Sequence, residues 1–409
     1  MLSAEDNELI TRTGPGTPMG ELFRRFWLPV ALAGEVGPAE SGPTRVTVLG
    51  EQLVAFRNAD GTLGLLEAAC PHRLANLFWG RNEGDGLRCV YHGWKFAADG
   101  RCTDQPAEPR PFCDRIRARS YPAREAAGLL WAYLGPAGAE PPFPRWEFTE
   151  VPAGHVYVSK RLQLCNWLQN LEGELDSAHV QILHAHAVGT LVSEAAAAPP
   201  RYQVERTDVG LLAMAVRSTP EGDDTAYWRV TPYLMPCFTI IPAPPGGPLT
   251  FTGAVPVDDV TMLGFTVTWN PHAPLTDEQL RVCREDDVLH VRVDPATFLP
   301  VVNRARDYHI DRAAQAAGSM TGIPGLRTQD LAVQEDQCGP ISPREREHLG
   351  STDRAIVATR RLLIDTARAL AAGTEPAQPH CADGYRCRSV AVEVPADRTW
   401  AGIVADAQP

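Results

Sequence analysis

The sequence lacks long hydrophobic runs, and its first residues lack the features of an export signal. No apolar stretch reaches the about 18 residues that a membrane-spanning helix needs. The opening MLSAEDNELITRTGPG has no basic segment followed by an apolar core. We therefore expect a cytoplasmic protein without a membrane span, whose ten cysteines serve in packing or metal binding rather than in disulfides.

Positive charge is also scarce. Lys and Arg number 38 against 50 Asp and Glu, and the net charge is -12. Because phosphate binding requires clustered Lys and Arg, nucleic acid is not an expected partner. The chain also lacks a Gly-rich dinucleotide fingerprint, so any NAD(P)H and flavin chemistry would belong to a separate protein.

The length of 409 residues favours two or three domains, and the local texture divides the chain into three parts. Residues 1–40 are predicted to be a helical segment that packs on the last domain. Residues 41–145 carry short β-rich runs with Gly and Asp turns, and end at the Pro-rich GPAGAEPPFPRW. The mixed domain 146–409 is predicted to hold a long helix at 161–186, strands at 200–270, a helix at 344–373 and an irregular C-terminal tail. The predicted fold class is α+β.

Two Cys–His pairs form the first candidate metal site. Cys70, His72, Cys89 and His92 follow the pattern C-x-H-x16-C-x2-H, so each of two tight loops supplies one thiolate and one imidazole. Two thiolates and two imidazoles suit either tetrahedral zinc or a [2Fe-2S] cluster with both histidines on one iron. Structural zinc sites usually pair Cys with Cys and His with His, so the mixed loops favour the cluster.

The residues around these loops carry a resemblance. The segment CPHRLANLFWGRNEGDGLRCVYHGWKF resembles the Rieske motif of aromatic-ring oxygenases. Respiratory Rieske proteins carry an additional Cys in each loop, where this chain has Ala75 and Tyr91. The resemblance implies a Rieske [2Fe-2S] cluster on an all-β domain, which transfers single electrons.

Asp176, His179 and His184 form the second candidate site, with the spacing D-x2-H-x4-H. Asp176 and His179 are three residues apart and can share a helix face. His179 and His184 are separated by about 140° around an ideal helix, so they can share a metal only if the helix bulges or ends between them. The spacing alone is more typical of ordinary surface or core histidines than of a metal site.

The segment NWLQNLEGELDSAHVQILH resembles the iron-binding segment of Rieske oxygenases of the phthalate-dioxygenase-like group. The resemblance extends over residues 20–370, with phenoxybenzoate dioxygenases among the similar proteins. It implies that His179 and His184 bind a mononuclear Fe(II) in a helix-grip catalytic domain. It also implies that Asp176 links this iron to the cluster of a neighbouring subunit in a homo-oligomer, most often a trimer.

The third iron ligand is expected in the segment LRTQDLAVQEDQCGPISPREREHLGSTD. Asp330, Glu335 and Asp336 are its candidates. The family pattern places the ligand five residues before a Glu, which favours Asp330 over Asp336. The segment departs from the family in reading EDQCGPI where ESMGPI is typical, a change that lies after the expected ligand.

The family resemblance also implies an activity. A separate NAD(P)H-dependent flavin and iron-sulfur reductase would supply electrons for the hydroxylation of an aromatic substrate by O2. The resemblance also implies an aryl carboxylate as substrate, which a guanidinium group can bind through paired hydrogen bonds. The candidate contacts are Ser177, Arg201, Arg206 and Arg229, although a surface or structural role is more common for any one of these arginines. Two alternatives remain open: a monooxygenase or O-demethylase of a methoxyaryl compound, and an electron carrier without oxygenase activity.

Overall fold

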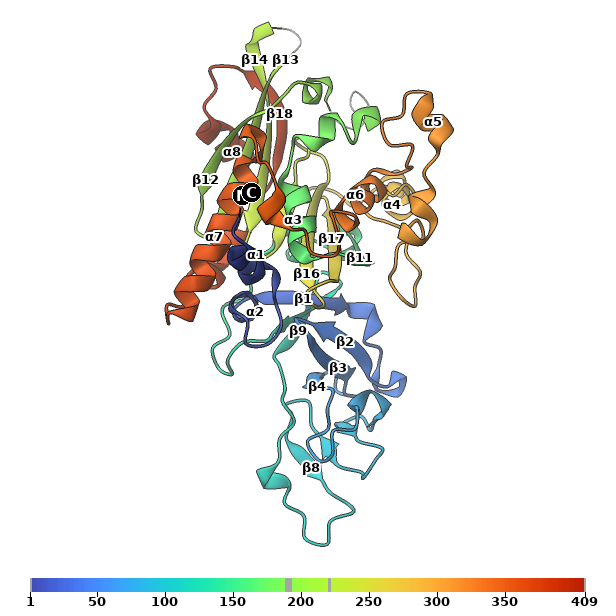
Figure 1. The fold of residues 1–409 in the computed structure, drawn as a ribbon. Coiled ribbons are helices and arrows are strands. Elements are labelled where there is room, and N and C mark those ends of the chain that lie inside the picture. The colour runs from blue at the N-terminus through green and yellow to red at the C-terminus, as the bar shows by residue number, and fades with distance from the viewer. Residues whose placement is uncertain (1, 188–192, 220–221, 408–409) are drawn as a thin grey trace.

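The computed structural model describes residues 2–187, 193–219 and 222–407 and divides into a narrow module and a broad one (Figure 1). The narrow module contains short strands from the first third of the chain. The broad module contains a large antiparallel sheet with helices around it. The predicted α+β class, an all-β module joined to a sheet-and-helix domain, is confirmed.

Three small antiparallel sheets build the narrow module. Their orders are β1-β10-β9, β2-β3-β4 and β5-β6-β7-β8. Turn glycines at positive φ, such as Gly50 (75°), Gly61 (89°) and Gly100 (84°), connect neighbouring strands. The strands are β1 Trp27–Leu32, β2 Thr44–Val48, β3 Glu51–Arg57, β4 Leu63–Glu67, β5 Arg81–Asn82, β6 Leu87–Arg88, β7 Lys95–Phe96, β8 Cys102–Asp104, β9 Ala123–Ala126 and β10 Leu129–Tyr133.

Strand β1 corrects the prediction that residues 1–40 are helical. Only α1 (Ala4–Thr11) and α2 (Pro18–Phe23) are α-helical there, and WLPVAL then pairs with β10. Pro29 has no N–H to donate, and it is tolerated because β1 lies at the edge of its sheet, with an irregular register between Pro29 and Ala31. The apolar run that suggested a helix face is thus a strand buried from Trp27 to Ala31.

The broad module is centred on one antiparallel sheet in the order β11-β17-β16-β15-β14-β13-β12, with β18 paired to β14. Its strands are β11 Val156–Gln163, β12 Arg201–Arg206, β13 Gly210–Thr219, β14 Gly222–Leu234, β15 Phe238–Ile241, β16 Leu249–Pro256, β17 Met262–Trp269 and β18 Val390–Pro395. The helices are α1 Ala4–Thr11, α2 Pro18–Phe23, α3 Trp167–Leu175, α4 Asp277–Glu285, α5 Arg312–Ala316, α6 Leu326–Glu335, α7 Arg354–Ala371 and α8 Trp400–Ala407.

Two predicted elements of this module were wrong. The segment 161–186 is the end of β11, then α3, then 3-10 turns, because the Asn166 side chain accepts the N–H of Leu168 and starts a separate helix. The C-terminal tail is ordered by β18, whose valines at 390, 392 and 394 alternate along the strand, and by α8. The helix predicted at 344–373 is confirmed only from Arg354 to Ala371, as α7; short 3-10 turns stand in the residues before it, and Gly373 at φ 92° follows its end.

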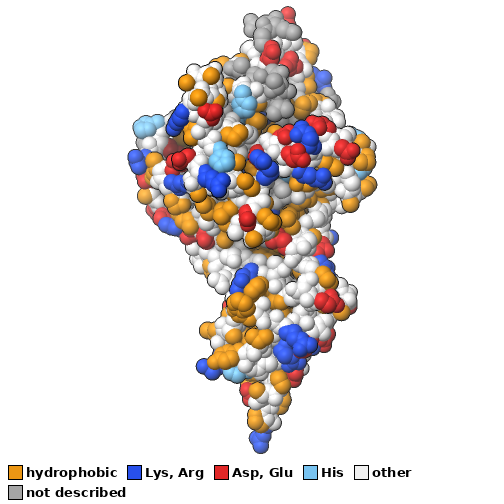
Figure 2. Space-filling view, turned by 90° about the vertical axis from the view of Figure 1, so that its right-hand side faces the viewer, with side chains coloured by type: hydrophobic (Ala, Val, Ile, Leu, Met, Phe, Trp, Pro, Cys, Tyr) orange, Lys and Arg blue, Asp and Glu red, His pale blue; other side chains and the backbone are white. Residues whose placement is uncertain are grey.

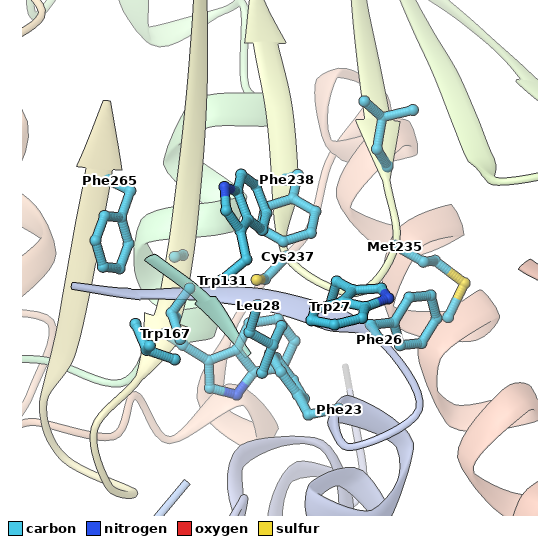
Figure 3. Packing of buried hydrophobic residues seen from close by; sticks show 14 of the residues in the cluster. Phe23, Phe26, Trp27, Leu28, Trp131, Trp167, Met235, Cys237, Phe238 and Phe265 are labelled. Atoms are coloured by element: carbon cyan, nitrogen blue, oxygen red, sulfur yellow. The ribbon is translucent and has the colours of Figure 1, made fainter. Parts of the chain in front are cut away.

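The largest hydrophobic core lies where the two modules meet. Figure 3 shows side chains of the N-terminal segment, including Phe23 and Trp27, packed with Trp131 of β10, Trp167 of α3 and Phe238 of β15. The backbone also crosses this junction, since Leu49 and Gly50 donate hydrogen bonds to the carbonyl groups of residues 256 and 257. The modules are therefore held in one fixed arrangement. In the part of the chain that is described, no helix combines the length and apolarity required to cross a membrane.

Candidate metal centres and the adjoining cavity

The two Cys–His loops have matching backbones. The N–H of Cys70 bonds the carbonyl of Ala75 and its carbonyl accepts from Leu74, while Cys89 makes the same two bonds with Trp94 and Gly93. The fourth residue after each cysteine has a positive φ, 60° at Leu74 and 80° at Gly93. Each loop therefore turns back on itself and presents its Cys and His on the same side.

The side chains of these loops fit a metal cluster. The rings of His72 and His92 lie 4.4 Å apart between centroids, and Trp94 stacks on His72 with an interplanar angle of 7°. The buried Nδ1 of His72 has no hydrogen-bond partner among the described residues, which is costly unless it binds a metal. Burial, with a smaller contribution from Cys89, raises the pKa of the Cys70 thiol to about 11, so a thiolate here requires a cation. Two thiolates and two imidazoles in mixed loops suit a [2Fe-2S] cluster of the Rieske type.

Exposed apolar side chains surround the loops. Leu74, Trp79, Val90 and Tyr91 expose 75%, 64%, 63% and 55% of their surface. Figure 2 shows hydrophobic side chains gathered on the narrow module. We call these four residues the apolar rim of the cluster loops. Apolar surface of this kind commonly marks a protein contact.

The second candidate site lies in the broad module, beyond the end of α3. The helix ends at Leu175, Asp176 has extended backbone (φ -78°, ψ 107°), and a 3-10 turn covers His179–Gln181. Because the helix ends before Asp176 and the 3-10 turn ends before His184, the two histidines face each other, with ring centroids 5.0 Å apart. This interruption of the helix is the condition under which His179 and His184, five residues apart, can share a metal.

Helix α6 brings Asp330 to the two histidines. Asp330 Oδ1 lies 3.0 Å from His184 Nε2 and 3.6 Å from His179 Nε2. The candidate ligand atoms of the three side chains all lie within 4.8 Å of one another. The rival carboxylates point elsewhere: Glu335 accepts from Tyr308, and the exposed Asp336 pairs with Arg304. Two imidazoles and one carboxylate on one side match the facial ligand set of non-haem Fe(II).

Each of these three side chains is held from behind by another residue. His179 Nδ1 lies 3.6 Å from Asp176 Oδ2. His184 Nδ1 donates to Gln329 Oε1 at 2.8 Å, and Gln329 is itself oriented by donating to the carbonyl of residue 323. With Nδ1 held by Gln329, His184 turns its Nε2 toward Asp330 Oδ1, the side on which a metal would bind.

Arg327 holds the third side chain. Its Nη1 lies 3.4 Å from Asp330 Oδ2, while its guanidinium also pairs with Glu174. Burial raises the pKa of Asp330, but the hydrogen bond of His184 and the charge of Arg327 outweigh burial and keep the pKa below its ordinary value. Asp330 is therefore a carboxylate at neutral pH, as a metal ligand must be.

A cavity of about 460 Å³ adjoins the two histidines and Asp330. Most of its wall is apolar, with residues from the loop after β15, from the segment before α6 and from β18. The apolar lining consists of Val180, Ile241, Pro242, Pro244, Pro245, Val288, Leu289, Leu326, Ala391 and Val392. A volume and lining of this kind suit a small organic molecule.

One polar corner of the cavity carries a positive charge. Arg229 on β14 is 8% exposed and lines the cavity with Ser177 and Tyr227. Its Nε lies 3.2 Å from Ser177 Oγ and its Nη1 3.5 Å from the Tyr227 hydroxyl; no ion pair links it to a carboxylate of the described residues, although Glu393 lines the same cavity. Arg217, outside this cavity, donates to the same Ser177 Oγ and carbonyl. A buried guanidinium without a counter-ion favours an anionic group on the bound molecule.

The structure separates the four predicted substrate contacts into two pairs. Ser177 and Arg229 line the cavity. Arg201 and Arg206 are the first and last residues of β12, at the edge of the sheet, and both are exposed outside this cavity. Sequence reasoning missed Arg327 and Gln329, although both stand within three residues of Asp330 in the segment RTQD.

Two family models match the chain. The model described as Rieske [2Fe-2S] domain matches residues 26–122, and the model described as LigXa C-terminal domain like matches residues 132–400. Together they cover both modules and both candidate metal sites.

Curated proteins similar to this chain are oxygenase subunits. The phthalate 4,5-dioxygenase oxygenase subunit of Pseudomonas putida is 37% identical, with 91% of this chain and 88% of that protein covered. The 3-chlorobenzoate-3,4-dioxygenase oxygenase subunit of Comamonas testosteroni is 36% identical, covering 94% and 93%. The 5,5'-dehydrodivanillate O-demethylase oxygenase subunit of a Sphingobium species is 33% identical, covering 92% and 83%.

Solved structures share the fold at lower identity. NdmA of Pseudomonas putida with theobromine superposes with a TM-score of 0.63 at 20% identity, covering 93% of this chain and 99% of that chain. Dicamba monooxygenase bound to dicamba gives 0.60 at 20% identity, covering 86% and 99%. These structures confirm the arrangement of a small β module on a sheet-and-helix domain.

Proposed function

The chain belongs to the Rieske non-haem iron oxygenases of the phthalate-dioxygenase-like group, and from this premise we propose that it is the terminal oxygenase that hydroxylates an aromatic carboxylate. The observation that carries the proposal is a cavity lined both by His179, His184 and Asp330 and by Arg229, a buried cation that has no counter-ion among the described residues. An anionic substrate would neutralise the guanidinium while its ring rests on the apolar wall. Among aromatic acids, a phthalate or a phenoxybenzoate is the substrate that we propose.

Some residues of the chain would hold the metal groups, and others would bind and position the substrate. Cys70, His72, Cys89 and His92 would hold the Rieske cluster, and His179, His184 and Asp330 would hold the mononuclear iron. When bound, these groups supply single electrons and activate O2. Arg229 and Ser177 would bind the carboxylate through charge-assisted hydrogen bonds. The apolar wall would exclude water and fix which ring carbon faces the three ligand side chains.

We further propose that the active assembly is a homo-oligomer, most simply a trimer, fed by a separate NAD(P)H-dependent reductase. Within one chain the cluster loops are in the narrow module and the iron site is in the broad one (Figure 1). Asp176 is partly exposed and lies beside His179, so a neighbouring chain could bring a cluster histidine to it. The apolar rim would supply contact area for that neighbour or for the reductase.

A second function, O-demethylation or another monooxygenation, is favoured by one comparison. The O-demethylase subunit of the Sphingobium species is similar to nearly the whole chain. The same ligand set and cavity would serve both reactions, because the substrate atom nearest the iron decides which bond is oxidised.

The test combines metal analysis with a substrate panel. The purified chain is expected to contain about three irons, two in the cluster and one mononuclear. With a compatible reductase, NADH and ¹⁸O2, it is offered phthalates, halobenzoates, phenoxybenzoates and methoxybenzoates, with the matching uncharged amides as controls. Labelled product from acids but not from amides supports the proposal. About two irons per chain after anaerobic Fe(II) loading would support the electron carrier instead.

A further inference from the structure

Arg327 is the residue whose placement the functional assignment leaves unexplained. Its guanidinium is 2% exposed, and it lies on α6 one turn before Asp330. Burying a guanidinium is expensive unless carboxylates and carbonyl groups satisfy it. Arg327 makes such contacts on three sides: with Glu174 of α3, with the carbonyl of Leu289 at 3.2 Å, and with Asp330.

The two oxygens of Asp330 have different partners. Oδ1 faces the Nε2 atoms of His184 and His179, at 3.0 and 3.6 Å. Oδ2 lies 3.4 Å from Arg327 Nη1. A carboxylate that chelated a metal would have to turn both oxygens toward the histidine nitrogens. That movement would leave Arg327 without its contact to Oδ2.

Arg327 cannot readily follow such a movement. Two of its nitrogens pair with Glu174, whose side chain is 4% exposed, and Nε donates to Leu289. The planar guanidinium fixes all these directions at once. Its position is therefore set by α3 and by the segment that follows α4, independently of any metal.

Resting on the proposed assignment of His179, His184 and Asp330 as iron ligands, we propose that Arg327 is a positioning residue that restricts Asp330 to binding iron through Oδ1 alone. One-oxygen binding leaves one more coordination position for O2 and substrate than chelation would. The role is distinct from that of Asp176 or Gln329, which orient imidazoles and do not change the number of ligand atoms.

The chain offers a matched control in Arg161. This arginine is 3% exposed and lies near the same carboxylates, but it contacts Gln163 and Thr266 and makes no ion pair with Asp330. Arg161→Gln therefore removes a nearby buried charge without touching the Asp330 carboxylate. Arg327→Gln removes the contact to Oδ2 but leaves Glu174 unpaired, so the double variant Glu174→Gln/Arg327→Gln guards against misfolding.

The experiment is cobalt K-edge X-ray absorption on the full chain, with its cluster retained and Co(II) replacing the mononuclear iron. Cobalt is absent from the cluster, so the spectrum reports this site alone. We expect one-oxygen carboxylate binding in the wild type and in Arg161→Gln. In both Arg327 variants we expect one additional oxygen neighbour and the short metal–carbon distance of a chelating carboxylate.

Two results would overturn the proposal: a chelating carboxylate already present in the wild type, or no change in either Arg327 variant. A different result tests the underlying function. If wild-type cobalt shows no imidazole neighbours, the ligand assignment itself fails and the role of Arg327 fails with it.

Discussion

At the scale of single residues, identical side chains a few positions apart have different surroundings. Asp330 lies in the middle of α6, and Asp336 directly follows the end of this helix. Asp330 is 13% exposed and faces His184, whereas Asp336 is 69% exposed and pairs with Arg304 at the surface. Exposed pairs of this kind contribute little to stability. The two positions are therefore natural comparators.

Asp330→Ala is expected to lose the mononuclear iron and keep the cluster, because two imidazoles alone hold Fe(II) weakly. Iron should fall from about three to about two per chain, with an unchanged visible spectrum of the cluster. Asp336→Ala is the control and should retain about three irons. Metal analysis after desalting measures the iron content of both variants. Loss of iron from Asp336→Ala but not from Asp330→Ala would make Asp336 the ligand.

Arg229→Gln is expected to weaken binding of an aryl carboxylate. Charge-assisted hydrogen bonds contribute about 1.5–3 kcal/mol, so the Kd should rise about ten- to a hundredfold. Binding of the uncharged amide should change little. Calorimetry with both ligands measures this difference, and Arg206→Gln, an exposed arginine outside the cavity, should match the wild type. Equal losses for acid and amide would argue against a carboxylate contact.

At the scale of elements, the iron site depends on how closely α3 and α6 approach. Gly173 lies in the last turn of α3, where an added Cβ would overlap the Nε2 of Gln334 on α6. Gln334 cannot move away freely, since its Oε1 accepts hydrogen bonds from Gln163 and Asn170. The absence of a side chain at residue 173 therefore sets the distance between the two helices.

Gly173→Ala is expected to destabilise the protein despite the better helix propensity of Ala. The propensity gain is about 0.5–1 kcal/mol, whereas forced overpacking costs about 1–3 kcal/mol. Displacement of α6 should also weaken retention of the mononuclear iron. Urea unfolding and iron content after dialysis are the two measurements. Gly154→Ala, where nothing lies within 4 Å of the added Cβ, is the control; a variant at 173 as stable as that control would contradict the steric argument.

At the scale of the whole molecule, the fixed arrangement of the modules governs how the two metal sites can cooperate. The shared core around Trp131 and the backbone bonds from Leu49 and Gly50 hold the modules in place. The cluster loops thus cannot swing to the iron site of their own chain without breaking this junction. Cooperation between chains is the consequence that can be tested.

Mixed assemblies provide the test. His92→Ala chains, deficient in the cluster, and Asp330→Ala chains, deficient in the mononuclear iron, are each expected to be inactive. Co-expressed with different tags and purified through both, they should regain a substantial fraction of wild-type product formation. A doubly tagged assembly with intact subunits but no activity would show that the two sites must belong to one chain. Doubly tagged wild-type chains are the control.

The sequence by itself determined the features that depend on short stretches of chain. The Cys70–His72 and Cys89–His92 loops were predictable because ligand types and turn residues lie within a few positions of one another. The meander β2-β3-β4 was predictable for the same reason, since its turn glycines are local signals. Asp176, His179 and His184 were proposed from the family resemblance, because their spacing alone did not favour a metal site. Local signals also gave wrong predictions. WLPVAL and residues 161–163 were predicted to be helical, but they are strands because they pair with β10 and β17.

Tertiary structure decided everything that requires distant segments to meet. The family register already favoured Asp330 over Asp336, but only the packing of α6 against α3, some 150 residues earlier in the chain, shows that Asp330 lies beside His184. The separation of Arg229 from Arg201 and Arg206 depends on which strand borders the cavity. The contact of Arg327 with Oδ2 depends on Glu174 holding the guanidinium in place. These contacts depend on packing between elements, which cannot be derived from residue type and spacing along the chain.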